Sequence, residues 1–307
     1  MNALDPELRQ AVADFPDHPR WHELGVAEAR RLEDDRFSSD AVPGVETVDR
    51  RVPRDGDSHV PVRTYRPPAL DRPAPALVFA HGGGFVLGTL DSADDLARRL
   101  AARTGSVVVS VDYRLAPEHP CPAAVADVAA VVEWVLEGTA DLGVDPGRVG
   151  VAGSSAGANL AAMARRRVDA PGRTLAPQVL LYPMLDPDLG LPAHEEHAGA
   201  PLLTRADLEW FWRRYRDGGS IPADDGRLSP LTAGVDGDAP PTVVVTAGVD
   251  PLRDDGTTYA RALSDAGVPV ERLHYPAACH GFLSMAGDST LATAAWADLA
   301  AAVLAYR

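Results

Sequence analysis

A serine, an aspartate and a histidine, each following a predicted strand, could together carry out nucleophilic catalysis in this 307-residue chain. A serine hydroxyl is a poor nucleophile on its own, and it becomes reactive when a histidine takes its proton. We expect His280 to take the proton of Ser155, while Asp250 fixes the tautomer of the imidazole and stabilises its protonated form. Each such residue alone is more often a surface residue, and the chain has nine histidines. Their common position after strands of one sheet singles these three out.

The serine lies in a tight turn between a short apolar run and a run of small residues. Residues 149–152 are long enough for a buried strand, and the residues from Ala158 onward suit a helix. Between them, Gly153-Ser154-Ser155-Ala156-Gly157 fits Gly-x-Ser-x-Gly, whose small residues permit a strained turn that lifts the hydroxyl above the sheet. The pattern alone is common, so a glycine-rich turn that holds serines by chance is the alternative interpretation.

A run of three glycines follows another predicted buried strand, residues 76–80. The segment His81-Gly82-Gly83-Gly84-Phe85 is costly in conformational entropy, which favours a loop whose amides approach a ligand oxygen. Such amides, with that of Ala156, could stabilise a tetrahedral oxyanion; one donor of this kind is worth about 3–4 kcal/mol. A flexible surface loop is the alternative. A phosphate-binding loop is rejected, because no Gly-Lys-Ser/Thr follows and the spacing to Gly88 does not give Gly-x-Gly-x-x-Gly.

Predicted strands alternate with predicted helices along most of the chain, which favours an α/β fold with a mostly parallel sheet covered on both faces. Ser155 follows the fifth strand, Asp250 the seventh and His280 the eighth. The first two strands form a hairpin with a turn at Asp55-Gly56-Asp57. The expected strands are residues 45–52, 60–65, 76–80, 107–111, 149–152, 177–182, 242–246 and 270–275, and the expected core helices are 96–102, 123–136, 259–266 and 291–306, with Asp145–Arg148 forming a turn before the fifth strand.

Two segments interrupt this alternation and are expected to form a helical cap. Residues 1–45 contain two or three amphipathic helices broken near Pro16 and Pro19, and residues 186–230 form a helical insertion. The core then consists of residues 46–185 and 231–307. The insertion carries an aromatic cluster, which packs its own small core, lines a pocket, or does both: Trp210, Phe211, Trp212 and Tyr215.

The insertion also contains His194-Glu195-Glu196-His197, which invites a zinc interpretation that we reject. The spacing is not His-Glu-x-x-His, and nearby Pro192, Gly199 and Pro201 argue against a regular helix. We therefore expect neither a metal nor an organic cofactor.

Composition restricts the partners and the compartment. The formal net charge is −15 and every basic residue except histidine is arginine, which argues against nucleic acid or an anionic membrane surface as a partner. Two cysteines, Cys121 and Cys279, form no disulfide framework. The polar N-terminal sequence does not resemble a secretory signal, and no apolar run approaches the roughly 20 residues of a membrane span. We expect a cytoplasmic location.

Five motifs together resemble the hormone-sensitive lipase family of esterases. These are HGGGF at 81–85, GSSAG at 153–157, DPLRDDG at 250–256, HGF at 280–282, and YRLAPEHP at 113–120 between the glycine run and the serine. The resemblance covers residues 45–307, and the N-terminal helices fit that family's cap. It implies an α/β-hydrolase fold, with an eight-stranded mostly parallel sheet, helices on both faces and a helical cap.

The resemblance also implies a function and a site. The function is that of a serine carboxylesterase that cleaves short- to medium-chain acyl esters through an acyl-enzyme. The implied catalytic triad is Ser155, Asp250 and His280, and the implied oxyanion donors are the amides of Gly83, Gly84 and Ala156, with Gly82 also placed to donate. Similar enzymes pair two subunits through the last strand and its helix, so a homodimer is expected.

Small departures from the family and two alternative functions stay open. Ser154 stands where the family usually has aspartate, Ala158 where it often has glycine, and Cys121 where it often has an aromatic residue. Cys279 is expected to be a buried, inert thiol. An amidase or peptidase could use the same triad. The family resemblance also embraces plant hormone receptors that bind a small ligand under the cap, but these usually lack the histidine.

Overall fold

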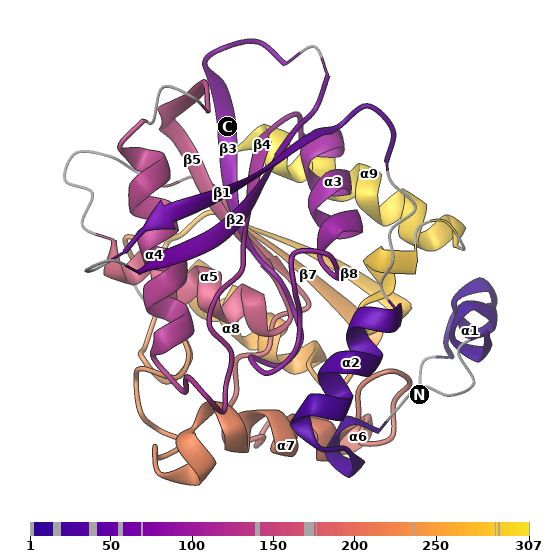
Figure 1. Ribbon diagram of the computed structural model, residues 1–307. Helices are drawn as coiled ribbons and strands as arrows, with labels where there is room; N and C mark the ends of the chain where they lie inside the picture. Colours follow the sequence, from indigo (N-terminus) through magenta and orange to yellow (C-terminus); the bar gives the residue numbers. More distant parts are fainter. Residues whose placement is uncertain are drawn as a thin grey trace.

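One eight-stranded sheet organises the described part of the chain, in the order β1-β2-β4-β3-β5-β6-β7-β8 (Figure 1). This computed structural model describes residues 3–14, 20–36, 42–54, 58–68, 70–138, 142–168, 175, 177–235, 237–285, 287 and 289–306. β2 is antiparallel to both β1 and β4, and all other neighbours are parallel, which confirms the predicted sheet. The strands are β1 (Glu46–Pro53), β2 (His59–Arg66), β3 (Ala74–Ala80), β4 (Val107–Val111), β5 (Val144–Ser154), β6 (Gln178–Leu181), β7 (Thr242–Val249) and β8 (Val270–Cys279).

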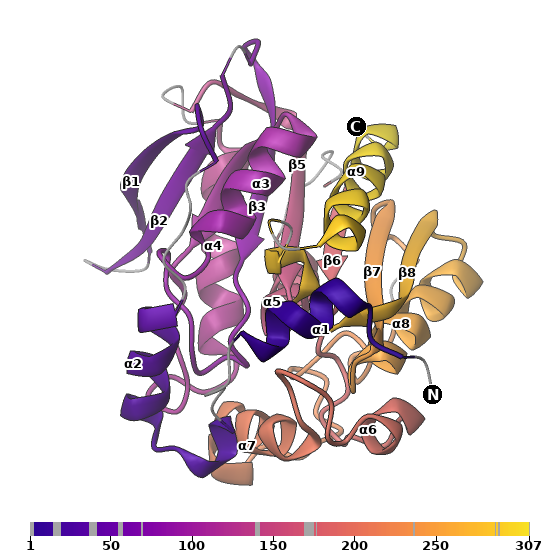
Figure 2. The ribbon, with the colours of Figure 1, turned by 90° about the vertical axis from the view of Figure 1, so that its right-hand side faces the viewer.

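Helices cover both faces of this sheet. α4, α5 and α8 pack on one face, while α3 and α9 pack on the other (Figure 2). The helices are α1 (Pro6–Ala13), α2 (Val26–Arg36), α3 (Asp94–Thr104), α4 (Ala123–Leu136), α5 (Ala156–Arg167), α6 (Pro192–Glu196), α7 (Arg205–Tyr215), α8 (Arg253–Asp265) and α9 (Thr290–Ala305), with single 3-10 turns η1 (Trp21–Glu23), η2 (Asp217–Gly219) and η3 (Phe282–Met285).

The central strands owe their position to continuous apolar runs. Every residue of β3 and β4 is buried, as expected of strands whose two faces are both covered. β8 lies at the end of the sheet and is only half-buried over most of its length. Burial of apolar side chains on both faces therefore fixes which strands are central, and parallel pairing brings the C-terminal ends of β3, β5, β7 and β8 to one edge.

The cap segments predicted from the sequence contact each other beyond this edge of the sheet. η1 contacts α7, and α2, α6 and α7 lie below the sheet in both ribbon views, with α2 and α6 on opposite sides of α7 in Figure 2 (Figures 1 and 2). Asp207 links two of these elements: its Oδ2 accepts from the Thr204 amide at 3.0 Å and so caps α7, and its Oδ1 accepts from the His22 amide at 3.0 Å. A side chain that caps one helix thus also holds η1.

The structure differs from the predicted elements at several boundaries. Asp145–Arg148, predicted as a turn, belongs to β5, and the register with β3 shifts between Ala74 and Ala76 because the strand bulges there. Residues 192–196, where a regular helix was not expected, form the short helix α6, with Pro192 in its first turn, where proline is tolerated. The predicted hairpin turn at 55–57 and the predicted breaks at Pro16 and Pro19 lie outside the described residues.

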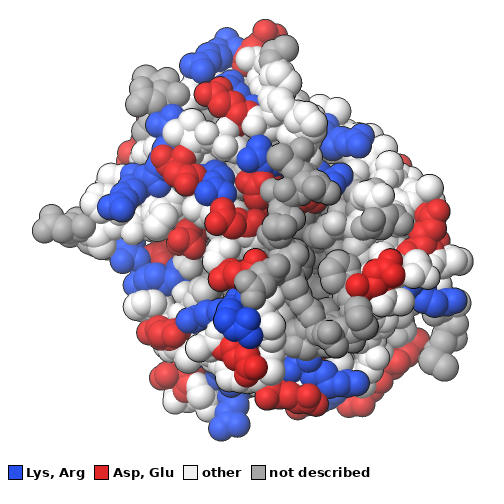
Figure 3. Space-filling view, turned by 45° about the vertical axis from the view of Figure 1, so that its right-hand side comes forward, with Lys and Arg blue, Asp and Glu red and all other residues white. Residues whose placement is uncertain are grey.

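The surface mixes charges of both signs. On the face in Figure 3, arginine and acidic side chains are interspersed rather than gathered into patches of one sign. Among the described residues, none of the helices combines the length and the apolar character that crossing a bilayer requires.

Candidate active site

Ser155 occupies a strained turn between β5 and α5. Its φ of 53° and ψ of −119° form a backbone conformation that costs a residue other than glycine about 1–3 kcal/mol. Three backbone hydrogen bonds hold it: its amide donates to the Leu181 carbonyl at 2.8 Å, and its carbonyl accepts from Ala158 and Met184 at 3.1 Å. The turn directs the serine side chain away from α5 and toward the edge of the sheet where the strands end.

Glycine at both ends of this turn lets backbone segments touch. A β-carbon at Gly153 would lie 2.2 Å from the carbonyl oxygen of Gly157. One at Gly157 would lie 2.1 Å from the carbonyl oxygens of Ala80 and His81. Because β-carbons essentially never approach other atoms within 3.0 Å, a larger residue would have to displace backbone. The prediction that these positions require glycine is confirmed.

His280 reaches both of the partners predicted for it. Its Nε2 lies 3.1 Å from Ser155 Oγ, and its Nδ1 lies 2.9 Å from Asp250 Oδ2. Asp250 is fully buried, and its Oδ1 accepts from the Leu252 amide at 2.9 Å. An ionised carboxylate only accepts hydrogen bonds, so this contact favours the tautomer with the proton on Nδ1. Nε2 is then free to accept from the serine hydroxyl, as a general base must.

The glycine loop lies beside this serine. Gly82 and Gly83 line the same cavity as Ser155 and His280. Within the described part of the chain, no hydrogen bond engages the amides of Gly82, Gly83 or Ala156. The amides of Gly82 and Gly83 are therefore available to an oxygen that enters the cavity, which is the property that an oxyanion site needs, and Ala156 directly follows Ser155 in the chain.

The second half of the loop packs on α7. A β-carbon at Gly84 would lie 2.1 Å from the ring of Phe211, and Phe85 stacks on Tyr215 with ring centroids 3.9 Å apart. The whole aromatic cluster of α7 is buried in the same hydrophobic core as Phe85. Its members are not among the described residues that line the cavity at Ser155. The cluster therefore packs, but into the large core beside the glycine loop and not in a small core of the insertion's own.

The cavity above Ser155 is small and has a mixed lining. Its volume is about 160 Å³. Both apolar side chains and hydroxyl groups line it: Phe79, Ala93 and Leu96, with Ser92, Ser154, Tyr182 and Ser284. The ring of Tyr182 meets that of His280 edge-on, with centroids 5.0 Å apart. The cavity can therefore hold a short chain and also a few polar atoms.

One acid that lines this cavity, Glu33 of α2, was not predicted from the sequence. The residue is 8% exposed, and its Oε2 accepts from the Gly88 amide at 3.0 Å. Burial raises the pKa of its carboxyl to about 7, and the neighbouring Asp34 adds to the rise, while hydrogen bonds from Ser92 and Gly88 oppose it. An amphipathic helix is expected to turn its charged residues to water. No sequence signal therefore distinguished this glutamate from the others of its helix.

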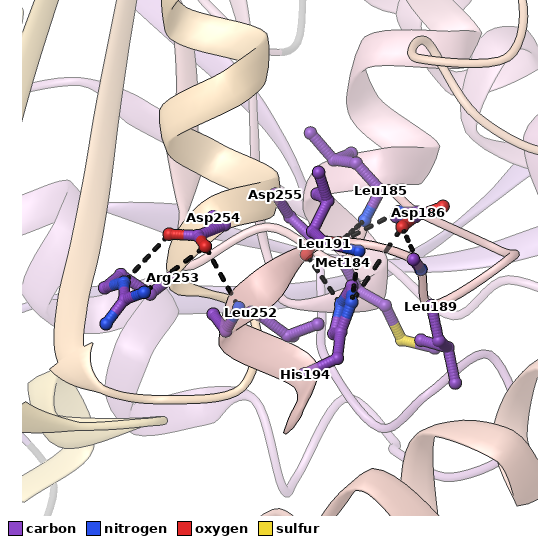
Figure 4. Close-up of polar contacts among 12 residues, drawn as sticks. Met184, Leu185, Asp186, Leu189, Leu191, His194, Leu252, Arg253, Asp254 and Asp255 are labelled. Carbon is purple, nitrogen blue, oxygen red and sulfur yellow. Dashed lines mark hydrogen bonds and ion pairs between the residues drawn. The ribbon is translucent and has the colours of Figure 1, made fainter. Parts of the chain in front are cut away.

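The histidines of residues 194–197 have structural partners. His194 is fully buried, its Nε2 lies 2.9 Å from Asp255 Oδ2, and its Nδ1 accepts from the Leu191 amide at 3.2 Å (Figure 4). Asp255 Oδ1 in turn accepts from the amides of Leu185 and Asp186, at 2.7 and 2.8 Å. This network attaches the insertion to α8. Among the described residues, no group of three or more histidine, cysteine, aspartate or glutamate side chains is arranged to hold a metal.

The residues that depart from the family pattern are accommodated without loss of a catalytic group. Ser154 lines the cavity, with its hydroxyl oxygen next to Gly82, and Ala158 is fully buried. Cys279 is fully buried, and burial raises the pKa of its thiol to about 12. Burial also raises the pKa of Cys121. Both thiols are thus held in their unreactive, protonated form.

Known proteins resemble this chain over most of its length. A family model described as the alpha/beta hydrolase fold matches residues 77–284. Carboxylesterase NlhH of Mycobacterium tuberculosis is 42% identical over 290 residues, which cover 92% of this chain and 90% of that protein. Ethyl acetate hydrolase of Pseudomonas putida is 40% identical over 239 residues, which cover 76% and 74% of the two chains.

Solved structures agree with these relatives. The hyperthermophilic esterase from the archaeon Pyrobaculum calidifontis matches with a TM-score of 0.87 at 35% identity, covering 99% of this chain and 98% of that one. The fold, the sequence motifs and the relatives thus lead to one assignment. This chain belongs to the α/β-hydrolase family, in its hormone-sensitive-lipase-type group of carboxylesterases.

Proposed function

We propose that this protein is a serine carboxylesterase that hydrolyses short- to medium-chain acyl esters through an acyl-enzyme. The observation that carries the proposal is the His280 imidazole, which contacts Ser155 Oγ at 3.1 Å and Asp250 Oδ2 at 2.9 Å. The relatives support an ester as the bond that is cleaved, since they are named a carboxylesterase and an ethyl acetate hydrolase.

The first half of the proposed reaction acylates the serine. His280 Nε2 takes the hydroxyl proton as Ser155 Oγ attacks the ester carbonyl carbon, and Asp250 stabilises the imidazolium that forms. The negative charge moves to the carbonyl oxygen, which accepts hydrogen bonds from the Ala156 amide and from the glycine loop. The loop donors proposed are Gly83 and Gly84, with Gly82 as a further candidate; of these three, Gly82 and Gly83 line the cavity at Ser155. His280 then gives its proton to the leaving alkoxide, and the alcohol departs.

The second half of the reaction releases the acid. A water molecule gives a proton to His280 Nε2 and attacks the acyl carbon, and the same amides stabilise the second oxyanion. When this intermediate collapses, Ser155 Oγ leaves and regains its proton from His280. The carboxylic acid is the second product, and the side chains return to their starting protonation states.

The size of the cavity supports a short acyl or alcohol group. Ligand pockets in proteins usually measure about 300–1,000 Å³, so a cavity of about 160 Å³ favours a short chain. Long fatty acyl chains would need the cap segments to move. This argument supports small esters over bulk fat as substrates.

The test is a series of p-nitrophenyl esters from acetate to palmitate, with Ser155→Ala alongside the wild type. We expect turnover that is highest for short and medium chains and falls to background in the variant, because the nucleophile is gone. A wild type that cleaves no ester but cleaves anilides would favour the amidase alternative. A wild type that cleaves neither, yet binds small ligands, would favour the receptor alternative. Turnover that survives in Ser155→Ala would contradict the mechanism.

The domain division remains part of the proposal. We infer that residues 1–45 and 186–230 act as one cap over a core of residues 46–185 and 231–307. The hydrogen bond from the His22 amide to Asp207 supports joint movement of the two cap segments. Limited proteolysis that removed the insertion while leaving ester specificity unchanged would contradict it.

Association and location are also proposals. β8 is an end strand that pairs with β7 alone among the described strands, and α9 carries Leu304, which is 49% exposed; both features support a homodimer through β8 and α9. A monomer in sedimentation equilibrium at micromolar concentration would contradict this. The cytoplasmic location stays a prediction, which fractionation of the source cell would test.

A further inference from the structure

Two charged residues of α2 contact opposite ends of one short turn. Arg30 Nε donates to the Val86 carbonyl at 2.9 Å, and Glu33 Oε2 accepts from the Gly88 amide at 3.0 Å. Positions 30 and 33 are neighbours on one face of a helix, so both side chains leave α2 toward the same loop. The cap helix α2 therefore forms hydrogen bonds with the backbone of the loop at two points.

The turn that Arg30 and Glu33 contact, residues 86–88, is the continuation of the glycine loop. The Gly83 carbonyl accepts from the amides of Val86 and Leu87, at 3.0 and 2.8 Å, so residues 83–87 form one compact unit. A β-carbon at Gly88 would lie 2.2 Å from the His81 ring, so the two ends of the loop are also in close contact. Movement of Val86 or Gly88 is thus transmitted to Gly83, which lines the cavity at Ser155.

The burial of Glu33 shows that its carboxyl serves a specific purpose. A buried carboxyl is costly unless it is paired or hydrogen-bonded. Within the described part of the chain, no cation forms an ion pair with Glu33. The neighbouring Arg30 instead pairs with Glu118, with 2.7 Å between Nη2 and Oε2. The Gly88 amide donates a hydrogen bond to this carboxyl, and the nearby Ser92 hydroxyl lowers its pKa. An apolar residue would fill this position at lower cost, but it would leave the Gly88 amide without an acceptor.

Arg30 makes further hydrogen bonds in addition to the one with Val86. Its Nη2 donates to the Ala116 carbonyl at 3.0 Å, while the Ala116 amide donates to the Phe85 carbonyl at 2.9 Å. The arginine thus joins the glycine loop to the neighbouring segment of residues 113–120. Glu118 receives both terminal nitrogens of the guanidinium, at 2.7 and 2.9 Å, and fixes its orientation.

We propose that Glu33 and Arg30 are positioning residues that hold the glycine loop so that its amides face the oxyanion formed at Ser155. The inference rests on the proposed ester hydrolysis. It assigns to α2 a part in transition-state stabilisation in addition to covering the site. Neither side chain needs to touch the reacting atoms for this role, because each acts through the backbone of residues 83–88.

The test compares variants that remove one of the two hydrogen-bond contacts between α2 and the loop with variants that keep it. Glu33→Ala removes the acceptor, whereas Glu33→Gln keeps an acceptor oxygen and the size of the side chain. Arg30→Met removes the donors but keeps the apolar stem, and Glu118→Gln removes the charge and one acceptor oxygen of the partner of Arg30. Glu28→Gln, on an exposed position of the same helix, is the matched control.

The readouts are kcat and KM on p-nitrophenyl butyrate, and inhibition by an alkyl trifluoromethyl ketone, which forms a tetrahedral oxyanion with the serine. Because oxyanion contacts act mainly in the transition state, we expect kcat to fall about 10- to 100-fold in Glu33→Ala and Arg30→Met. KM should stay within about twofold, and inhibition should weaken by the same factor as kcat/KM. Glu33→Gln and Glu28→Gln should stay within about threefold of wild type, and the loss in Glu118→Gln should lie between theirs and that of Arg30→Met, because Glu118 orients the guanidinium of Arg30.

Each contrary result has its own meaning. A folded Glu33→Ala and Arg30→Met with wild-type kcat would overturn the inference while ester hydrolysis stands. Loss confined to KM, or loss of kcat with unchanged inhibition by the ketone, would also overturn it, because the oxyanion would then be unaffected. If circular dichroism shows that Glu33→Ala is unfolded, kcat and ketone inhibition of Arg30→Met, compared with those of Glu33→Gln, test the proposal instead. A wild type that leaves the ester intact would overturn both the proposed function and this inference.

Discussion

Replacing Gly157 by alanine should damage both stability and activity, although alanine is the better helix former. Gly157 lies in the first turn of α5, where alanine would by propensity alone stabilise the protein by up to about 1 kcal/mol. A β-carbon there would lie 2.1 Å from two backbone oxygens, so α5 and the end of β3 must separate by about 0.9 Å to restore a distance of 3.0 Å. Overpacking of this kind costs about 1–3 kcal/mol. We therefore expect net destabilisation.

The same displacement should lower activity beyond the loss of folded protein. The atoms that would be pushed apart connect the turn of Ser155 to the glycine loop, through Ala80 and His81. A misplacement of about 1 Å between reacting groups can cost about 100-fold in rate. We expect kcat/KM on p-nitrophenyl butyrate to fall about 100-fold per folded molecule, with the folded fraction taken from urea unfolding followed by tryptophan fluorescence.

A matched control separates the clash from the general effect of exchanging glycine for alanine. Gly199 is exposed, and a β-carbon there would meet no atom within 4 Å. Gly199→Ala should keep wild-type activity and an unchanged urea midpoint. If Gly157→Ala keeps kcat/KM within about threefold of wild type, or gains stability, the reasoning from the close backbone contact is refuted.

Two further predictions follow from the buried carboxyls. Asp250→Asn should lower kcat about 10⁴-fold on p-nitrophenyl butyrate, because an amide can donate to Nδ1 and stabilise the wrong tautomer of His280; a loss below tenfold in a folded variant would contradict the assigned role. The pKa of Glu33 is raised in the folded state from 4.5 to about 7, so the folded state binds the proton more tightly than the unfolded state. The free energy of unfolding therefore falls as the pH rises from 4.5 to about 7, by up to about 3 kcal/mol. Urea unfolding at pH 5 and pH 8 should show this decrease in the wild type and a smaller one in Glu33→Gln, and equal decreases in the two proteins would contradict it.

The parts of the fold that could be predicted from the sequence are those set by local pattern. The strand 107–111 and the helix 123–136 have the bounds that their apolar runs predicted, because burial requires apolar residues along the whole buried segment. Ser155, Asp250 and His280 could be chosen because each follows a strand of the sheet, and the structure brings their side chains together. Spacing along the chain was sufficient here because the parallel sheet aligns the strand ends.

What could not be predicted depends on contacts between distant segments. Glu33 and Gly88 are 55 residues apart, and nothing in α2 separates a glutamate that faces a cavity from one that faces water. His194 was rejected as a metal ligand, but its real partner, Asp255 of α8, was not foreseen. The packing of the α7 aromatic cluster around Phe85, away from the cavity, likewise required the fold to be known.

The absence of lysine from the sequence has a consequence for covalent chemistry. Activated esters and organophosphorus reagents commonly acylate or phosphorylate side-chain amines as a slow background reaction, and this chain offers none. Guanidinium groups stay protonated and do not compete as nucleophiles. Intact-protein mass spectrometry with an ester-like suicide reagent should therefore count Ser155 adducts without background from lysine amines. The mass increase would then titrate functional sites directly, without a separate activity standard.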